Sequence, residues 1–102
     1  MPDGGPVDLS TPRLRWLAAR MEARYALGDA YAMGTDGDAL LTLAHELAHR
    51  AASRLDAADV STLLGEPLLP REAQVKRLAD RCYDELYGLA CINGWYRVAE
   101  SG

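Results

Sequence analysis

Apolar residues recur at intervals of three and four positions in three long stretches of the chain. This spacing gathers them on one face of an α-helix, whereas a half-buried strand would alternate apolar and polar residues. The pattern therefore predicts three long amphipathic helices and no strand. The expected core positions are Leu14, Leu17, Ala18, Met21 and Tyr25 in the first helix; Leu40, Leu41, Leu43, Ala44, Leu47, Ala48, Ala51, Ala52 and Leu55 in the second; and Val75, Leu78, Ala79, Cys82, Leu86, Leu89 and Ala90 in the last.

Local signals predict where these helices begin and end. Thr11 followed by Pro12 is a capping hydroxyl ahead of a proline at the first helical position, and Gly34 is a C-terminal cap if the helix passes Gly28. Asp56 and Gly65 bound a further, short helix. The predicted ranges are 12 to 28 or 34, 38–55, 57–64 and 70–92, with Asn93-Gly94 as the final stop and Trp95-Tyr96 folding back onto the bundle.

The predicted fold class is all-α, a small antiparallel bundle of three long helices and one short helix. Residues 1–9 are rich in Gly and Pro and predict a disordered N-terminal segment, and residues 10–102 predict a single helical domain. From Cys82 onward the last helix is apolar nearly all round. We therefore expect it either at the centre of the bundle or in a homodimer interface formed by residues 75–96.

Composition and charge narrow the possible functions. Hydrophobic residues make up 49% and charged residues 25% of the 102 residues, as in a folded domain. A net charge of −4 argues against a nucleic-acid partner, because neutralising phosphates requires basic residues. Without a signal peptide or an apolar run of about 20 residues, we expect a soluble, cytoplasmic protein with no membrane partner. The richness in Ala, Leu and Arg suggests a high-GC, bacterial genome.

The two cysteines, Cys82 and Cys91, lie nine positions apart. On a continuous helix this places them about 180° apart around the axis and roughly 13 Å apart along it, too far for a disulfide. We therefore expect two buried free thiols.

The strongest chemical motif is His45-Glu46-Leu47-Ala48-His49, two imidazoles one helical turn apart with a carboxylate between them. This is the spacing by which zinc hydrolases hold a metal ion and a general base on one helix. Residues 41–49 resemble the active-site helix of zinc metallopeptidases of the ImmA/IrrE type. The resemblance implies His45 and His49 as zinc ligands, Glu46 as the catalytic base, and Glu72, within residues 71–74, as the third metal ligand.

Two observations oppose a complete zinc enzyme. That family carries strands ahead of its metal-binding helix, where residues 10–40 here predict helix. His45 also lies roughly 100°, and His49 about 140°, from the centre of the apolar face, so we expect both imidazoles to point toward water with no wall opposite them.

A lesser alternative takes Glu46-Leu47-Ala48-His49 as the Glu-x-x-His signature of a carboxylate-bridged metal bundle, with Glu22 as a further ligand. Because none of these sites is complete in the sequence, the leading prediction is a non-catalytic helical interaction or regulatory module. Such a module would bind a protein partner or a second copy of itself. The cofactor stays open, with zinc expected under the enzyme hypothesis.

Overall fold

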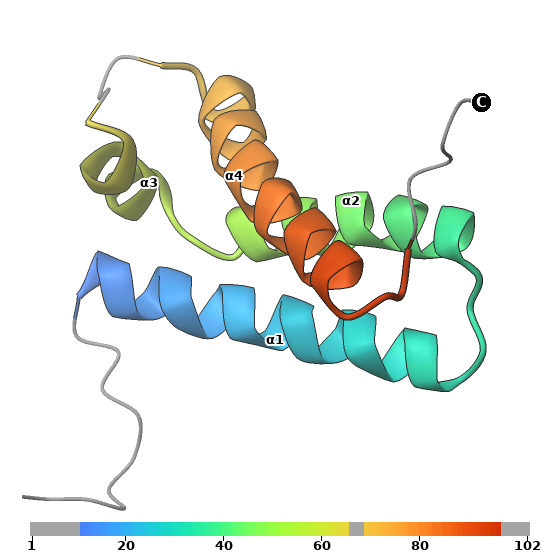
Figure 1. Ribbon diagram of the computed structural model, residues 1–102. Coiled ribbons are helices and arrows are strands. Elements are labelled where there is room, and N and C mark those ends of the chain that lie inside the picture. The colour runs from blue at the N-terminus through green and yellow to red at the C-terminus, as the bar shows by residue number, and fades with distance from the viewer. Residues whose placement is uncertain (1–10, 66–68, 97–102) are drawn as a thin grey trace, which may run out of the picture.

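The computed structural model describes residues 11–65 and 69–96, and over these residues it is entirely helical (Figure 1). The all-α prediction, with three long helices and one short helix, is confirmed for this part of the chain. The segment 1–9 that was predicted to be disordered lies outside the described residues. The helices are α1 (Pro12–Ala32), α2 (Gly37–Ser53), α3 (Ala57–Leu64) and α4 (Arg71–Ile92).

Short polar side chains begin the first three helices, as predicted for α1 and α3. Thr11 Oγ1 accepts the backbone N–H of Leu14 at 3.2 Å ahead of α1. Asp36 accepts from Ala39 at 2.9 Å ahead of α2, and Asp56 accepts from the third residue of α3 at 2.8 Å. Each bond satisfies a backbone donor that has no partner inside the helix.

Glycine ends two of the long helices. Gly34 has a φ of +96°, and the N–H of Thr35 turns back to the carbonyl of Ala30 at 3.1 Å. Gly94, with a φ of +73°, ends α4 in the same way. These are Schellman motifs, in which a left-handed residue lets the chain satisfy the last carbonyls of the helix. The corresponding bond in α4 runs from Trp95 N–H to the Ala90 carbonyl at 2.8 Å.

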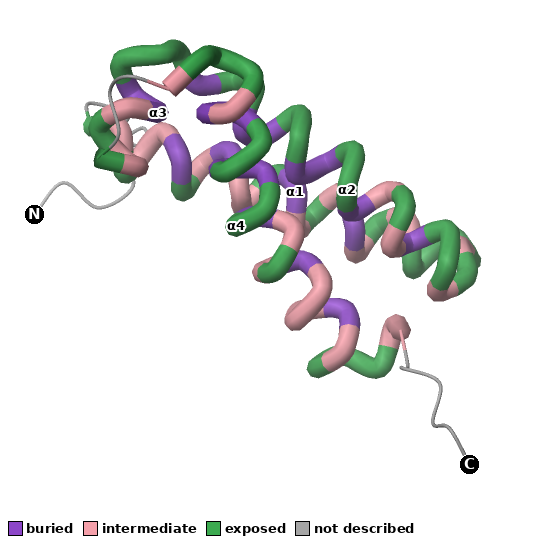
Figure 2. The backbone as a smooth tube through the Cα atoms, turned by 90° about the horizontal axis from the view of Figure 1, so that it is seen from above, coloured by how far each residue is buried: buried purple, intermediate pink, exposed green. Residues whose placement is uncertain are grey.

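The helices are not packed as a regular antiparallel bundle, which corrects one expectation. α1 and α2 form an antiparallel hairpin, but α4 crosses both of them obliquely (Figures 1 and 2). Along the chain, α3 separates α2 from α4, so no short turn forces α4 to run alongside α2.

The buried face of α1 also differs from the predicted one. Leu17 is 44% exposed and Tyr25 69% exposed, so the predicted stripe does not form the core. The core is contacted instead by a second series at the same helical spacing, which begins two residues later and whose alanines allow the backbone of α2 to approach closely. Its members are Trp16, Ala19, Ala23 and Leu27.

One of the two expectations for α4 was a place at the centre of the bundle, and the structure does not bear this out. Cys82 and Leu86 are buried, but Ile92 is 86% exposed, and much of the second half of the helix is only half-buried (Figure 2). Both cysteines are free, as expected, although Cys91 is half-buried rather than buried. Burial raises the pKa of the Cys82 thiol to about 11, which leaves it protonated and unreactive near neutral pH.

The chain folds back after α4, as predicted. The Trp95 ring stacks on Tyr31 of α1, with ring centroids 5.3 Å apart and an interplanar angle of 22°. An added Cβ at Gly28 would lie 3.3 Å from the Trp95 ring, so the absence of a side chain there lets the indole pack against α1.

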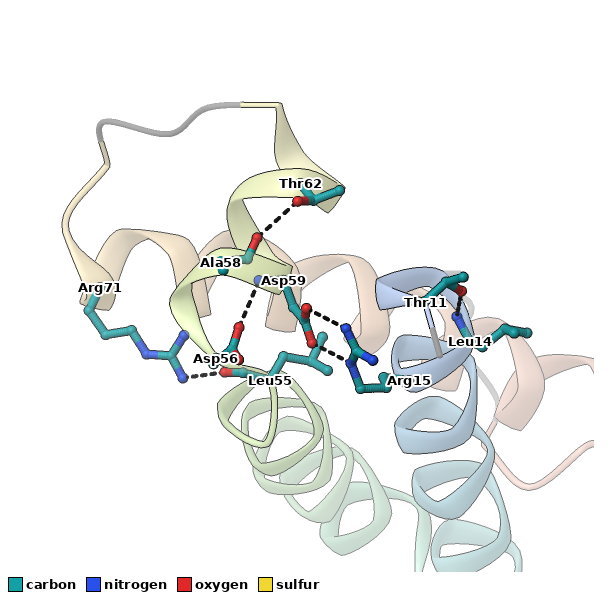
Figure 3. A network of polar contacts seen from close by, with 9 residues as sticks. All are labelled: Thr11, Leu14, Arg15, Leu55, Asp56, Ala58, Asp59, Thr62 and Arg71. Carbon is teal, nitrogen blue, oxygen red and sulfur yellow. Dashed lines mark hydrogen bonds and ion pairs between the residues drawn. The ribbon is translucent and has the colours of Figure 1, made fainter. Parts of the chain in front are cut away.

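An ion pair fastens the short helix α3 to the start of α1 (Figure 3). The Arg15 guanidinium donates two hydrogen bonds to the Asp59 carboxylate, from Nε at 2.6 Å and from Nη2 at 2.7 Å. These bonds lower the pKa of Asp59 below its ordinary value of 3.8 and raise that of Arg15. Just ahead of α3, Arg71 donates to the carbonyl of Leu55 at 2.6 Å, closing the turn after α2 (Figure 3).

Candidate functional site

The motif helix α2 is amphipathic in the phase that the sequence predicts. Its buried residues include Leu40, Ala44 and Ala51, and the polar side chains of the motif, His45, Glu46 and His49, lie on the exposed side. The phase of the helix therefore agrees with the expectation, but the surroundings of the motif do not.

His45 and His49 are exposed, as expected, but α4 lies opposite them, where the sequence predicted no wall. An open groove of about 650 Å³ runs between α2 and the first half of α4. We call it the histidine groove. Its lining residues are His45, His49, Ser53, Arg71, Glu72, Val75, Lys76, Ala79 and Asp80.

His45 is held by aromatic packing. Its ring lies face to face with the ring of Tyr83 on α4, with centroids 3.8 Å apart and an interplanar angle of 9°. Burial raises the pKa of the Tyr83 phenol above its ordinary value, so the ring under His45 is neutral near pH 7. The stack joins α2 to α4 and leaves the edge of the imidazole, which carries both nitrogens, outside the ring contact.

His49 lies one helical turn after His45 on α2 and lines the same groove. Its Nδ1 is 3.4 Å from Ser53 Oγ, which orients the ring and engages one of its two nitrogens. Nε2 is the nitrogen outside this contact, so a ligand in the groove would meet His49 through Nε2.

Glu46, the expected catalytic base, lies on the other side of the histidines. It lines a shallower, adjoining hollow together with both histidines, Arg50 and Ser53, and it is not among the residues that line the histidine groove. A general base must reach the water that it activates. The two imidazoles border both spaces, so Glu46 adjoins the histidines but does not line the groove that also holds Glu72.

Glu72, the expected third metal ligand, lies in the first turn of α4 and lines the histidine groove with both imidazoles. Sharing a groove is weaker than ligation, which needs donor atoms within about 2.0–2.2 Å of one point. Among residues 11–65 and 69–96, no three His, Cys, Asp or Glu side chains are grouped so that they could hold a metal ion.

Glu22, the carboxylate of the alternative metal bundle, is directed elsewhere. It pairs with Arg54 and lines a cleft between α1 and α2 that contains neither histidine. The structure thus brings Glu72, but not Glu22, to the motif.

Sequence reasoning missed several groups of the histidine groove, because their positions depend on how α4 crosses α2. Arg71 donates to the carbonyls of Leu55 at 2.6 Å and Ser53 at 3.3 Å, so its guanidinium ties the start of α4 to the end of α2. Lys76 and Asp80 form an i,i+4 ion pair at 3.4 Å on the opposite wall. Of these groups, only the Lys76–Asp80 pair could be predicted from the sequence, because the two residues are four positions apart on one helix.

A second candidate surface lies on the far side of α1. Met21 and Tyr25 line a groove of about 350 Å³ together with Leu89 of α4 and the Trp95 ring. Ile92 follows Leu89 by three positions and therefore lies on the same side of α4. We call this surface the outer face, formed by Leu14, Leu17, Met21 and Tyr25 of α1 with Leu89 and Ile92 of α4.

The outer face has charged borders. On one side, Glu85 of α4 accepts from Arg20 at 2.8 Å and from Arg24 at 3.4 Å. On the other side Glu22 pairs with Arg54 of α2. These pairs lie near the surface, where each contributes little to stability, and their charged groups stay accessible to a partner.

No protein-family model, curated protein or solved structure matches this chain. Within the described residues, no helix combines the length and the apolar character needed to cross a membrane.

Proposed function

We propose that this protein is a helical interaction module that binds a protein partner through the outer face. The observation that carries the proposal is the second apolar stripe of α1, which points away from the core and includes Leu17, 44% exposed, and Tyr25, 69% exposed. Clustered exposed apolar side chains with polar borders are typical of protein-binding surfaces.

The proposed interface is shifted from the range 75–96 that the sequence suggested. Most of the apolar stripe of α4, including Leu78, Cys82 and Leu86, is used inside the chain. Leu89, near the end of the helix, lines a groove with Met21 and Tyr25 of α1, and the exposed Ile92 follows it by one turn. α1 therefore contributes the larger share of the proposed surface.

Site-specific crosslinking in the cells that produce the protein tests this function. A photoreactive amino acid at position 25 should give a covalent adduct with a protein. The same amino acid at position 33 serves as the control, because Met33 is 86% exposed but lies outside the outer face. An absence of adducts from position 25, or equal adducts from both positions, would contradict the proposal.

A second candidate, a zinc-dependent hydrolase, is favoured by the common groove of His45, His49 and Glu72. The described residues supply two imidazoles but no converged third ligand, and Glu46 adjoins the imidazoles without lining the groove that holds Glu72. The residues present therefore do not fit a complete catalytic zinc site, and we derive no hydrolytic step from them.

Metal analysis of untagged protein distinguishes the two candidates. The hydrolase requires close to one zinc ion per chain, which should be lost in His49→Ala and reduced in Glu72→Gln. Asp38→Asn, which changes an exposed carboxylate in the first turn of α2, is the control. Metal-free protein, or metal content unaffected by His49→Ala, would end the hydrolase hypothesis.

A further inference from the structure

α1 carries two apolar stripes on nearly opposite sides. The inner stripe through Ala19 and Ala23 faces the core, and the outer stripe lies about 160° away around the helix axis. The outer residues Leu14, Leu17, Met21 and Tyr25 are spaced by three, four and four positions, the pattern with which a helix packs along another helix. In Figure 1, α2 and α4 both lie on the same side of α1, which forms the lower edge of the described molecule.

The charges beside the outer stripe differ in sign on its two sides. Arg20 and Arg24 lie about 60–100° to one side of the stripe and Glu22 lies about 100° to the other, at the same height along the helix. Their partners inside the chain do not bury them, since the side chain of Arg24 is 41% exposed and that of Glu22 is 63% exposed.

This arrangement of charge is self-complementary in one orientation. When two copies are related by a two-fold axis parallel to α1, the basic side of each stripe meets the acidic side of the other. When the two helices run antiparallel, each side meets its own copy, and the arginines face arginines. The first orientation places Arg24 of one copy beside Glu22 of the other, while the apolar residues pack between them.

We infer that the partner of the outer face is a second copy of this chain, packed α1 against α1 in parallel about a two-fold axis. The inference rests on the proposed interaction function and names its partner. Leu89 extends the contact beyond α1, because it lines one groove with Met21 and Tyr25, and Ile92, 86% exposed, follows it by one turn of α4.

Sedimentation equilibrium of the full chain tests the dimer. We expect twice the 11.1 kDa mass of one chain. Leu17→Glu or Tyr25→Glu should each raise the dimer dissociation constant by about thirty-fold or more, as at interface hot spots. Met33→Glu, at a residue 86% exposed outside the outer face, should leave the dissociation constant unchanged. Circular dichroism checks that each variant keeps its helices.

Charge exchange tests the parallel orientation. Glu22→Lys and Arg24→Glu should each weaken the homodimer, because each places like charges across the interface. Mixing the two variants should restore dimerisation, since each chain then meets opposite charges at both contacts. In an antiparallel dimer residue 22 would face residue 22 and residue 24 would face residue 24, so each single variant would only exchange one pair of like charges for another. Homodimers of Glu22→Lys and Arg24→Glu that are as tight as the wild-type dimer would therefore contradict the parallel orientation.

Different results would contradict the homodimer and the proposed interaction function. A chain that stays a monomer at high concentration, or a dimer unaffected by Leu17→Glu and Tyr25→Glu, overturns the inference. If position 25 then crosslinks to a different protein, the interaction function stands with another partner. If position 25 gives no adduct at all, both are wrong.

Discussion

At the scale of single residues, tertiary packing assigns roles that residue type alone does not reveal. His45 belongs to a motif that suggests metal chemistry, yet the face of its ring lies 3.8 Å from the Tyr83 ring. Asp59 looks like an ordinary acidic residue in the first turn of a short helix, yet it is only 7% exposed and receives both hydrogen bonds of the Arg15 fork. A buried carboxylate is tolerated because a partner of opposite charge satisfies it.

Asp59→Asn should lower the melting temperature at pH 7, because it removes the charge that Arg15 binds while keeping the side-chain size. The bonds from Arg15 hold the pKa of Asp59 below 3.8 in the folded chain. The stability that the charge provides is therefore present above about pH 4 and is lost as pH falls through the lower, folded-state pKa. Thermal melts from pH 7 to pH 2 should show the difference between wild type and variant shrinking in acid.

Asp80→Asn is the matched control for that series. Asp80 pairs with Lys76 on one exposed helix face, with 68% of its side chain accessible, so we expect its loss to cost less than about 0.5 kcal/mol. A gap between wild type and Asp59→Asn that persists unchanged to pH 2 would contradict the role given to the ion pair.

At the scale of elements, the helices begin and end where local chemistry indicates. The predicted range of α3 agrees with the structure, and α4 begins within one residue of its predicted start at Pro70. α1 passes through Gly28 and ends ahead of Gly34, which settles the alternative that its sequence left open. Caps and left-handed glycines act over about five neighbouring residues. Both partners of each capping hydrogen bond therefore lie in one short stretch of sequence, which makes the helix ends predictable.

Two glycine substitutions should change stability in opposite directions. Gly34→Ala should cost about 1–2 kcal/mol, because an L-residue is strained at a φ of +96° although no neighbouring atom would clash. Gly88→Ala, inside α4 with open space around an added Cβ, should stabilise the fold by about 0.5–1 kcal/mol. Urea unfolding measures both, and changes of the same sign would contradict either the assigned end of α1 at Gly34 or the helical conformation of Gly88 inside α4.

At the scale of the whole molecule, the packing of α1 decides both the core and the candidate interface. Leu17 and Leu27 are the same residue type on the same helix, but Leu27 is 1% exposed and Leu17 is 44% exposed. The sequence pattern favoured the stripe that contains Leu17. The series that contains Leu27 is buried because Ala19 and Ala23 between its larger residues admit the neighbouring helix.

Leu27→Ala should cost about 2–5 kcal/mol of unfolding free energy, because it leaves a cavity in the core. Leu17→Ala should cost less than about 1 kcal/mol in dilute protein, where no interface contributes. Chemical denaturation at low concentration compares the two. Equal losses would mean that the two stripes of α1 have been assigned to the wrong sides.

The sequence alone determined the all-helical class, the number of helices, most of their ends and the buried phase of α2, because these follow from periodicity and from interactions between near neighbours. It also identified His45, His49 and Glu72 as groups worth tracing, which the fold brings to one groove. Tertiary structure alone decided which stripe of α1 is buried, how α4 crosses the hairpin, and that the histidines face a wall. Those outcomes depend on contacts between residues far apart in the chain. The free energy of such a contact depends on how well two helix faces fit together, which the local sequence pattern of one helix does not describe.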